Sequence, residues 1–460
     1  MSGDPRLSFF SDADSVRKKL TEGGLSATAA ADKASLFGKS AEALRQVGVA
    51  EDKKVGAYFV PGRIEVLGKH TDYAGGRSVV ATAEKGFCLI AAPRADRRVN
   101  IYVAATGEKS EFFIAPDLTP TMGHWSNYPM TVVRRVARNF PGELKGMDLA
   151  FESDLPPAAG MSSSSAMMVS VFLVWAKINN LYQRREYTSN IDGMEALAGY
   201  LGTVENGQSF GTLTGDKGVG TFGGSEDHTA ILCARPKRLS QYCYCPVRFE
   251  RFIDVPEGYI FAIAGSGVVA EKTGAARAKY NRASLLATAV KNLWNQQTGR
   301  NDLHLAAALA SSDQAVRRMR DILKKGSCDG FTGKELSDRF EQFYAESEEI
   351  IPAAGDAMNN GDMESFGRQV DRSQKLTTTQ LVNQVPETVF LAKTARELGA
   401  AAASAFGAGF GGSVWSLAAA DKAEELLQNW ARRYHTAYPK SAANARYFLT
   451  YPGPSAFALV

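Results

Sequence analysis

The stretch Pro61–Gly76, PGRIEVLGKHTDYAGG, places four side chains that can bind a polar ligand between Pro-Gly and Gly-Gly. Arg63, Lys69 and His70 offer hydrogen-bond donors, and Asp72 offers an acceptor. Such a charged loop is typical either of a small polar substrate site or of a salt-bridged surface. The stretch alone leaves both readings open, and the lysine at its centre needs an explanation.

A second stretch, DLPPAAGMSSSSAMMVS at Asp154–Ser170, carries four consecutive serines that lead from a Pro-Pro turn into an apolar run. The backbone N–H groups at the start of a helix, together with serine hydroxyls, form a ready site for an anion. An ordinary helix cap would account for one serine. The four serines therefore favour a phosphate-binding loop over simple capping.

Asp227 stands between Glu226 and His228 in GVGTFGGSEDHTAIL, Gly218–Leu232. One carboxylate near a phosphate site can act as a base or as a metal ligand. A solvated surface acid is the alternative. The letters GVGTFG match G-x-G-x-x-G, but they neither follow a convincing strand nor open a helix, so we do not predict a dinucleotide-binding fold.

A further glycine-rich stretch, GAGFGGSVW at Gly407–Trp415, allows the backbone to approach a ligand or another chain segment closely. A β-bulge or a strand crossing would explain the same glycines. The stretch alone leaves these alternatives open.

The composition excludes several classes of protein. A hydrophobic content of 45% in 460 residues predicts a substantial core, and a net charge of +4 with dispersed signs does not favour nucleic acid or a membrane surface. No apolar run approaches transmembrane length, and the charged N-terminus lacks the pattern of a signal peptide. The five cysteines do not suggest a disulfide scaffold. We expect a cytoplasmic protein.

The elements that must position these stretches follow from local patterns. The first fifty residues have helical spacing, and short β-rich runs follow from Val55 to Val103. Residues 125–140 and 163–181 read as helices, and 147–155 as a strand. Further strands are expected at TAILCA (229–234) and GYIFAIAG (258–265), before a largely helical part from about 272 to 399. These patterns predict an α+β protein in two joined halves, with a boundary near 250–270.

Together and in this order, the stretches resemble the sugar-kinase branch of the galactokinase, homoserine kinase, mevalonate kinase and phosphomevalonate kinase (GHMP) superfamily. The opening stretch resembles the galactokinase signature PGR-x-x-x-x-G-E-H-T-D-Y-x-G-G. The serine stretch resembles the phosphate loop P-x-x-x-G-L-S-S-S-A, and GAGFGG resembles the C-terminal glycine motif. GGSEDH aligns with the turn that carries the catalytic aspartate of galactokinases. The likeness runs from about Gly56 to Leu417.

This resemblance implies a two-domain fold with the active site between the domains. The N-terminal half would be ribosomal-protein-S5-like and the C-terminal half ferredoxin-like. The expected organisation is an N-terminal helical extension over 1–50, an N-terminal GHMP domain with the sugar signature and phosphate loop over 51–255, and a C-terminal GHMP domain over 256–460.

The resemblance also implies ATP and Mg²⁺ as cofactors. Magnesium would be held by Ser164 and by Glu205, which lies where the family carries its metal-binding glutamate. The residues expected at the ATP site, with two aromatic residues flanking adenine, are Trp125, Tyr128, Gly160, Met161, Ser162, Ser163, Ser164, Ser165, Gly409 and Gly411.

The implied reaction is ATP-dependent phosphorylation of the anomeric C1 hydroxyl of galactose, giving galactose 1-phosphate and ADP. Asp227 would accept or orient the proton of that hydroxyl. Arg63 would keep the aspartate ionised and steady the transferring phosphoryl group. The residues expected to bind the sugar are Lys69, His70, Asp72, Gly224 and Tyr280.

Lys69 departs from the family, because galactokinases have glutamate there, facing the C6 hydroxyl of the sugar. A lysine can donate to a hydroxyl, but it suits a C6 carboxylate better, through a charge-assisted bond. A galacturonate-type substrate is therefore an alternative, and so is a Lys69 that points away and pairs with Glu65. Galactose is favoured because the other matched sugar-facing positions are unchanged.

Other departures indicate a divergent subgroup. The sequence GQSFGTLTGD is inserted between Glu205 and Asp227, Ala158 replaces a frequent glycine, Ser165 replaces an alanine, and His228 replaces a glutamine. Some relatives are regulators that bind ATP and sugar without turnover, and here the intact serine loop and aspartate favour catalysis. GKHTDY argues against mevalonate or homoserine as substrate. The expected partners are a small sugar and ATP, with no nucleic acid and no membrane, in a monomer.

Overall fold

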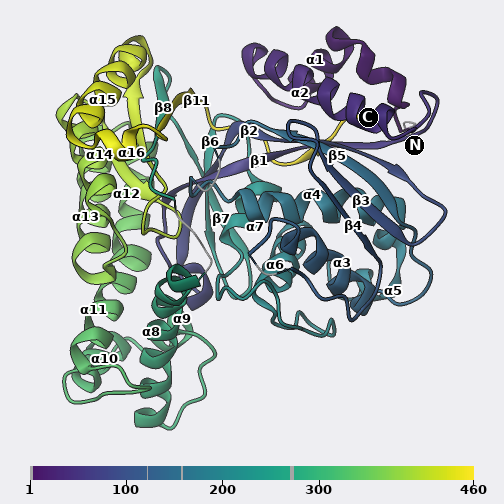
Figure 1. The fold of residues 1–460 in the computed structure, drawn as a ribbon. Helices are drawn as coiled ribbons and strands as arrows, with labels where there is room; N and C mark the ends of the chain where they lie inside the picture. The colour runs from purple at the N-terminus through teal and green to yellow at the C-terminus, as the bar shows by residue number, and fades with distance from the viewer. Residues whose placement is uncertain (1–3, 122, 157–158, 270–273) are drawn as a thin grey trace.

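The computed structural model describes residues 4–121, 123–156, 159–269 and 274–460. Two sheets organise these residues, as Figure 1 shows. The first sheet has eight strands in the order β12-β1-β2-β5-β3-β4, and β6, which pairs with β7, is joined to β2. Its strands are β1 (Gly56–Leu67), β2 (Arg77–Pro93), β3 (Arg98–Val103), β4 (Lys109–Phe113), β5 (Met147–Ser153), β6 (Arg238–Cys243), β7 (Arg248–Asp254) and β12 (Phe457–Ala458).

Helices cover both faces of the first sheet (Figure 1). The helices α1 (Ala13–Glu22) and α2 (Ala27–Gln46) lie on one face, where α2 contacts β2 and β5. On the other face α4 packs against β1 and β2. The helices of this side are α3 (Asn127–Asn139), α4 (Ser163–Ile178), α5 (Arg185–Thr188), α6 (Met194–Asn206) and α7 (Glu226–Cys233).

Strand β1 is buried on both faces because its side chains alternate between two hydrophobic clusters. Tyr58 and Val60 belong to the cluster around α4, whereas Ala57 and Phe59 belong to the cluster under α1 and α2. Alternation of this kind is what the two-residue period of a strand produces. The N-terminal helices therefore complete the core of the first sheet.

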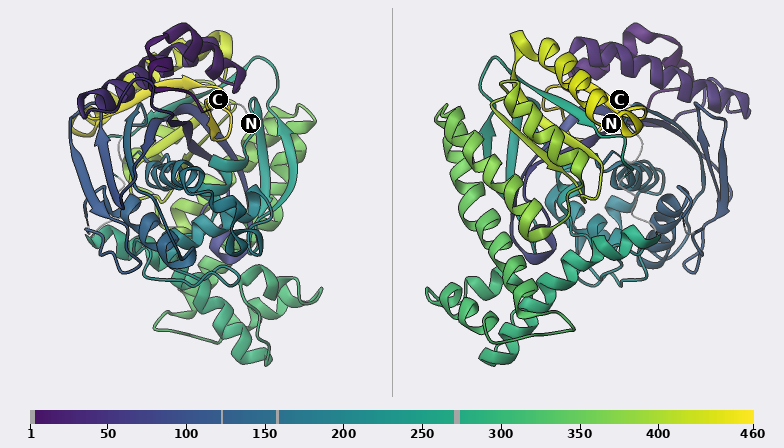
Figure 2. Two further views of the ribbon diagram at one scale, coloured as in Figure 1. Left: turned by 90° about the vertical axis from the view of Figure 1, so that its right-hand side faces the viewer. Right: turned by 60° about the vertical axis from the view of Figure 1, so that its left-hand side comes forward.

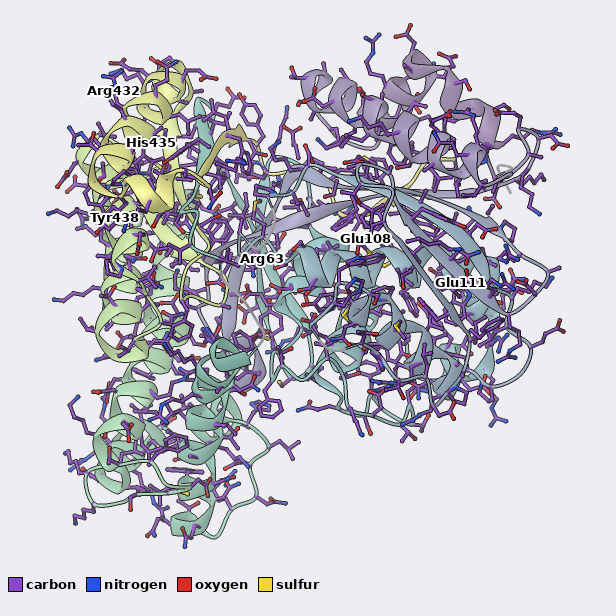
Figure 3. The ribbon with its side chains drawn as sticks, viewed as in Figure 1. Arg63, Glu108, Glu111, Arg432, His435 and Tyr438 are labelled. Atoms are coloured by element: carbon purple, nitrogen blue, oxygen red, sulfur yellow. The ribbon has the colours of Figure 1, made fainter. Side chains whose placement is uncertain are left out.

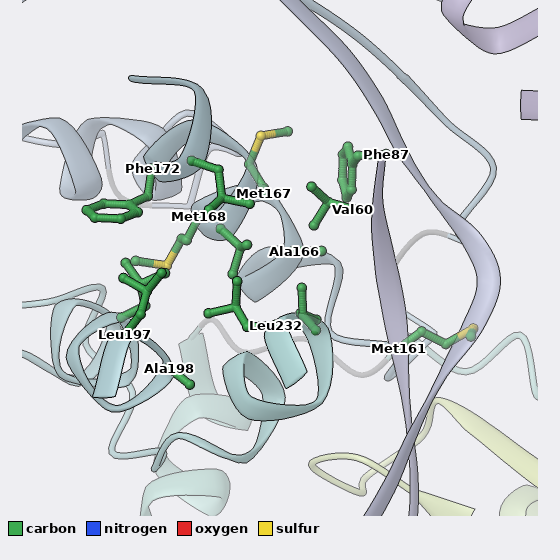
Figure 4. Packing of buried hydrophobic residues seen from close by; sticks show 14 of the residues in the cluster. Val60, Phe87, Met161, Ala166, Met167, Met168, Phe172, Leu197, Ala198 and Leu232 are labelled. Carbon is green, nitrogen blue, oxygen red and sulfur yellow. The ribbon is translucent and has the colours of Figure 1, made fainter. Parts of the chain in front are cut away.

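Helix α4 is the centre of the larger cluster. Every residue from Ser165 to Ala176 is buried, so the helix has no solvent face along this length. Figure 4 shows Met168 and Phe172 of α4 beside Leu197 of α6, with Leu232 of α7 close by. This dense packing fixes the position of the serines that open the helix.

The second sheet is antiparallel in the order β11-β8-β10-β9 and comes from the C-terminal half. Its strands are β8 (Tyr259–Gly265), β9 (Ala402–Phe406), β10 (Ser413–Ala419) and β11 (Arg446–Thr450). Helices α14 and α15 supply Leu391 and Trp430 to one face, and α13 supplies Phe366 to the other. The helices here are α12 (Ile351–Asn359), α13 (Met363–Leu376), α14 (Pro386–Glu397), α15 (Ala423–Ala437) and α16 (Pro439–Ala442).

A helical segment connects β8 to the rest of the C-terminal half and projects away from both sheets, which Figure 2 shows from two sides. It consists of α8 (Gly274–Thr298), α9 (Leu305–Leu309), α10 (Ala315–Leu323) and α11 (Gly333–Tyr344). Its α8 and α11 pack against each other. The chain end then returns to the first sheet, where Phe457 of β12 pairs with Phe59 of β1.

The predicted α+β architecture is confirmed, but one predicted strand is wrong. Residues 229–234, TAILCA, belong mostly to helix α7 and not to a strand. A short apolar run that is buried all round does not show its period, so sequence alone does not separate the two states. Strands β4, β7 and β12 were not predicted. Ala158 lies outside the described residues, and no helix among the described ones is long and apolar enough to span a membrane.

Candidate active site

A cavity of about 770 Å³ gathers the chemistry-bearing stretches from both halves of the chain. Residues that line it come from β1, from the starts of α4, α7 and α8, from the end of α6 and from the loop after β9. In Figure 3, Arg63 lies near the border between the two sheets. The predicted site residues that line the cavity are Arg63, His70, Asp72, Trp125, Tyr128, Gly160, Ser162, Ser163, Ser164, Glu205, Gly224, Asp227 and Tyr280.

One end of the cavity is formed by the start of α4, where the sequence predicts phosphate binding, and is called the phosphate end below. Ser162 caps this helix in a left-handed conformation, with φ of 59°, and its Oγ is buried without a hydrogen-bond partner among the described residues. The first backbone N–H groups of a helix have no partner within the helix, and its dipole favours an anion there. The unpartnered hydroxyl and the helix start together fit a phosphate group.

The C-terminal glycine stretch packs directly against this loop. Ser413 Oγ donates to the carbonyl oxygen of Ala159 at 2.6 Å. A Cβ added to Gly407 would lie 2.8 Å from the carbonyl oxygen of Gly160, so only glycine allows this approach. The stretch therefore holds the phosphate loop from the side of the second sheet.

Gly409 and Gly411, which were predicted at the ATP site, are not among the described residues that line the cavity. A Cβ on Gly409 would meet the carbonyl oxygen of Asn383 at 2.3 Å, and one on Gly411 would meet that of Val268 at 2.6 Å. These glycines let the loop pack against its own domain. Gly407 and the residue after it, Ala408, line the cavity in their place.

Met161 also differs from its predicted ATP-binding role. It is 1% exposed, belongs to the hydrophobic core, and accepts a hydrogen bond at its carbonyl oxygen from the N–H of Arg63 at 3.1 Å. Figure 4 shows its side chain pointing away from α4, toward the strands. Its contribution is to fasten the phosphate loop to β1.

Arg63 and Asp227 form the closest charged pair at the centre of the site. Asp227 Oδ1 accepts from Arg63 Nε at 2.7 Å and lies 2.6 Å from Nη2. Arg63 Nη1 also reaches the carbonyl oxygen of Gly160 at 3.4 Å, next to the phosphate loop. A carboxylate held by a guanidinium is kept ionised. The pair therefore places an acid held by a guanidinium beside the phosphate end.

Ser165 points beneath the cavity wall and links two carboxylates. Its Oγ lies 2.8 Å from Glu205 Oε2 and 3.3 Å from Asp227 Oδ2, and His228 Nε2 lies 3.4 Å from Glu205 Oε2. It was predicted to contact ATP, but as the third residue of α4 it faces the packed side of the helix. Ser165 thus joins the predicted base to the predicted metal ligand.

The insertion before Asp227 does not displace Glu205 from the site. Arg134 of α3 donates to Asp216 at 2.7 Å, and Arg135 donates to the carbonyl oxygen of Gln208 at 2.6 Å, so the inserted loop is held against α3. Glu205, at the end of α6, lines the cavity together with Ser164.

Asp72 is held rigidly at the end of the cavity where the sequence predicts sugar binding, which is called the sugar end below. It accepts hydrogen bonds from the N–H of Tyr73 at 2.8 Å and from that of Glu226 at 3.1 Å, and burial raises its pKa. A Cβ on Gly224 would lie 2.4 Å from Asp72 Oδ2. His70 is fixed nearby by contacts of 3.0 Å to Tyr73 Oη and 3.1 Å to the carbonyl oxygen of Ala408.

Lys69 lies behind this end of the cavity and not on its wall. Its side chain is 1% exposed, and Lys69 is not among the described residues that line the cavity. The Nζ of Lys69 has no hydrogen-bond partner in the part of the chain that the structure describes. Helix α11 holds the turn, because Gln342 and Arg339 donate to the carbonyl oxygens of Lys69 and His70. The positive φ of His70, 59°, turns the chain so that only His70 of the two faces the cavity.

Two lining residues were not predicted as functional. Glu65 and Glu226 are 4% and 5% exposed, and both approach Arg63. Burial, and then the charge of Glu65, raise the pKa of Glu226 well above its ordinary value. A weak signal existed, because Glu65 follows Arg63 by two residues on one strand face and Glu226 precedes Asp227.

Trp125 and Tyr128 line the other end of the cavity, where Trp125 packs edge-on against Phe151 at 6.0 Å. Trp125 Nε1 donates to Glu108 at 2.6 Å, which fixes the indole ring. Figure 3 shows Glu108 on the side of the first sheet, away from the second. This end offers flat apolar surface that suits a nucleobase.

Three family models match the chain: GHMP kinases N terminal domain over 127–205, GHMP kinases C terminal over 355–436, and galactokinase galactose-binding signature over 46–93. With the fold and the cavity described above, these matches define the class: the chain belongs to the GHMP kinases. Within that superfamily, the third model identifies a galactokinase-like member.

Similar proteins agree with this assignment. A galactokinase of Roseiflexus sp. (strain RS-1) is 27% identical over 83% of this chain and 88% of that protein, and one of Glaesserella parasuis serovar 5 is 25% identical over 82% and 88%. The structure of Lactococcus lactis galactokinase complexed with galactose matches with a TM-score of 0.73 at 22% identity, covering 91% of this chain and 98% of that one. L. major mevalonate kinase, with a TM-score of 0.51 at 15% identity, covers 87% and 97%. The GHMP kinase fold is thus confirmed.

Proposed function

We propose that the protein transfers the γ-phosphoryl group of ATP to the C1 hydroxyl of galactose, giving galactose 1-phosphate and ADP. The observation that carries this proposal is the convergence of the Arg63–Asp227 pair, the serine loop and the sugar signature on one cavity. The galactokinases among the similar proteins and the galactose-binding signature support galactose as the sugar.

The phosphates of ATP lie at the start of α4, where Ser162, Ser163 and Ser164 line the cavity. Trp125 and Tyr128 flank the adenine at the opposite end. Helix N–H groups and serine hydroxyls offset the phosphate charge, so Arg63 is the one cationic side chain that the proposal needs here. Gly160 and Gly407 allow the backbone to approach closely here.

Asp227 orients the C1 hydroxyl and takes up its proton as the oxygen attacks phosphorus. Arg63 keeps Asp227 ionised and stabilises the charge that develops on the phosphoryl group, because its Nη1 also faces the phosphate loop. The hydroxyl groups of the sugar ring are bound by His70, Asp72, Gly224 and Tyr280. A site that hydrogen-bonds a hydroxyl strongly rejects sugars that lack it.

Magnesium fits the residues present. Glu205 is a buried carboxylate on the wall of the cavity that Ser164 also lines, although no group of three His, Cys, Asp or Glu residues that could hold a metal occurs in the described part of the chain. Mg²⁺ is commonly held by one or two protein ligands together with phosphate oxygens and water. Ser164 and Glu205 would hold the ion, which would supply charge neutralisation at the phosphates.

The same proposal includes the division of the chain into 1–50, 51–255 and 256–460. It also includes a cytoplasmic location, because the reaction draws on ATP. A monomeric state stays a prediction.

The test is ATP consumption by the purified protein with Mg²⁺, with galactose and galacturonate offered separately. We expect turnover on galactose, and its loss in Asp227→Ala. Sugar binding measured by calorimetry without turnover would contradict the proposal and favour a non-catalytic regulator. Turnover on galacturonate alone would assign a related sugar 1-kinase.

A further inference from the structure

The sugar end of the cavity holds more carboxyl groups than cations. Glu65, Asp72, Glu226 and Asp227 all line it, whereas Arg63 is the one arginine or lysine among the described lining residues. Three of these carboxyl groups, those of Glu65, Glu226 and Asp72, are at least nine-tenths buried. The charge of this end is therefore unbalanced before any ligand binds.

Of these four acids, Asp227 is the one within hydrogen-bond distance of Arg63. Its Nη2 lies 2.6 Å from Asp227 Oδ1, whereas Glu226 Oε1 lies 3.8 Å from its Nε and Glu65 Oε2 lies 4.0 Å from its Nη1. The two longer separations exceed hydrogen-bond length. Glu65 and Glu226 thus receive part of the charge of Arg63 but no hydrogen bond from it.

Two of the glutamates that line the cavity each have one carboxyl oxygen without a hydrogen-bond partner among the described residues. Glu65 Oε1 and Glu226 Oε1 are buried and have no hydrogen-bond partner among the described residues. A buried polar atom without a partner is unfavourable, so a ligand that brings donors to these atoms gains affinity. The hydroxyl groups of a sugar are such donors.

Asp72 differs from these two acids, because backbone N–H groups already satisfy it. Lys69 does not line the cavity and reaches Glu65 only through its charge, which opposes the rise in pKa that burial causes in Glu65. No described cation on the wall is therefore left to receive a second anion.

We propose that Glu65 and Glu226 are specificity-determining residues, which receive hydroxyl groups of an uncharged sugar and exclude a sugar that carries a carboxylate. This inference rests on the proposed function, because it assumes that the sugar occupies this end of the cavity. A carboxylate placed there would be a further buried negative charge beside Asp227. The one described arginine or lysine on the wall, Arg63, already pairs with Asp227, so burying that second charge is costly.

The first experiment compares three ligands on the unaltered protein: galactose, galacturonate and galacturonamide. The amide has nearly the shape of the acid but no charge. We expect kcat/KM to be at least a hundredfold higher for galactose than for galacturonate. We also expect galacturonamide to exceed galacturonate at least tenfold, with most of the difference in KM. Equal use of acid and amide, or preference for galacturonate, would overturn the proposal.

The second experiment uses Glu65→Gln and Glu226→Gln, which replace an ionisable carboxyl group with a neutral amide of nearly the same shape. Each should lower the galactose-to-galacturonate ratio of kcat/KM at least tenfold. Glu349→Gln, which alters an exposed ion pair with Arg372, is the matched control and should leave the ratio unchanged. A ratio within threefold of the unaltered protein in both glutamine variants would contradict the inference.

Failure of the proposed function and failure of the inferred sugar specificity give different results. If galactose is not phosphorylated at all, the proposed function fails, and calorimetry with the three sugars still tests exclusion: binding of galactose and the amide without the acid supports it, and any other pattern overturns it. If galactose is phosphorylated but acid and amide behave alike, the function stands and the inference fails. The comparison of acid with amide needs no variant and so does not depend on variant folding.

Discussion

The phosphate end and the sugar end of the cavity are formed by different kinds of chemical group. At the phosphate end, helix N–H groups, serine hydroxyls and closely approaching glycines act with few charges, and Ser162 Oγ is the buried unpartnered atom. At the sugar end, buried charged side chains dominate, and Glu65 and Glu226 carry the unpartnered oxygens. Backbone groups suit a ligand that is common to all GHMP kinases, whereas side chains can change with the acceptor.

Asp227→Ala should have the largest effect, because Asp227 stands where the two ends meet. A positioned general base contributes about 10²- to 10⁴-fold, so kcat should fall by that order. Binding of ATP, measured by calorimetry, should change little. Asp421→Ala, on the exposed turn before α15, is the control and should retain full activity. Comparable activity in Asp227→Ala and in the control would contradict the proposed role of Asp227 as the general base.

Gly224→Ala should damage the sugar end alone. The added methyl group would lie 2.4 Å from Asp72 Oδ2 and displace a carboxylate that two N–H groups hold. The KM for galactose should rise about tenfold to a hundredfold, the loss expected from one or two hydrogen bonds. The KM for ATP should stay within about twofold of its original value, and an equal rise in both KM values would mean that the two ends are not separable.

Gly407→Ala should give the opposite pattern. Its φ is +81°, and the added methyl group would lie 2.8 Å from the carbonyl oxygen of Gly160. Strain of about 1–2 kcal/mol should shift the phosphate loop and raise the KM for ATP roughly tenfold, with little change for galactose. Steady-state kinetics with each substrate varied in turn measures this.

Gly38→Ala is the matched control for both glycine variants. A Cβ there meets nothing within 4 Å, inside helix α2. It should leave both KM values unchanged and raise the free energy of unfolding by up to about 1 kcal/mol, the difference in helix propensity.

Ser165→Ala should have a smaller effect on kcat. It removes the hydroxyl that lies between Glu205 and Asp227, at 2.8 and 3.3 Å, without touching the cavity wall. We expect kcat to fall about tenfold, and the Mg²⁺ concentration for half-maximal rate to rise. Ser165→Thr, which keeps a hydroxyl, should recover part of the rate. Loss of activity with unchanged Mg²⁺ dependence would place Ser165 in core packing only.

The smallest expected effect is on the pH dependence of stability, in Glu226→Gln, whose sugar preference is tested separately above. Burial, and then Glu65, raise the pKa of Glu226 above its ordinary value of about 4.5, so the folded protein holds a proton that the unfolded chain releases. Stability therefore falls as pH rises through this window. The decrease in Tm between pH 5 and pH 8 should be smaller in the variant by about 1–2 °C. A larger decrease in the variant would reverse this assignment.

Local patterns were sufficient where neighbouring residues decide the outcome. The serine loop, the Arg63-bearing strand and most helices could be predicted from spacing and composition, since capping and periodicity are local. TAILCA was misread because a fully buried short run has no visible period. Lys69 could not be placed, because its orientation depends on Arg339 and Gln342 of α11, some 270 residues further along the chain.

The sequence, with its resemblance to the GHMP kinases, determined the order of the motifs and the class of chemistry. It also predicted that the pair Arg63 and Asp227 lies at the centre of that chemistry. Only the tertiary structure decided which side chains reach the cavity. It turned Ser165 inward to two carboxylates, left Lys69 behind the wall and brought Glu65 and Glu226 onto Arg63. The physical reason is that residue type fixes what a side chain can do, whereas burial and direction are set by segments packed from elsewhere in the chain.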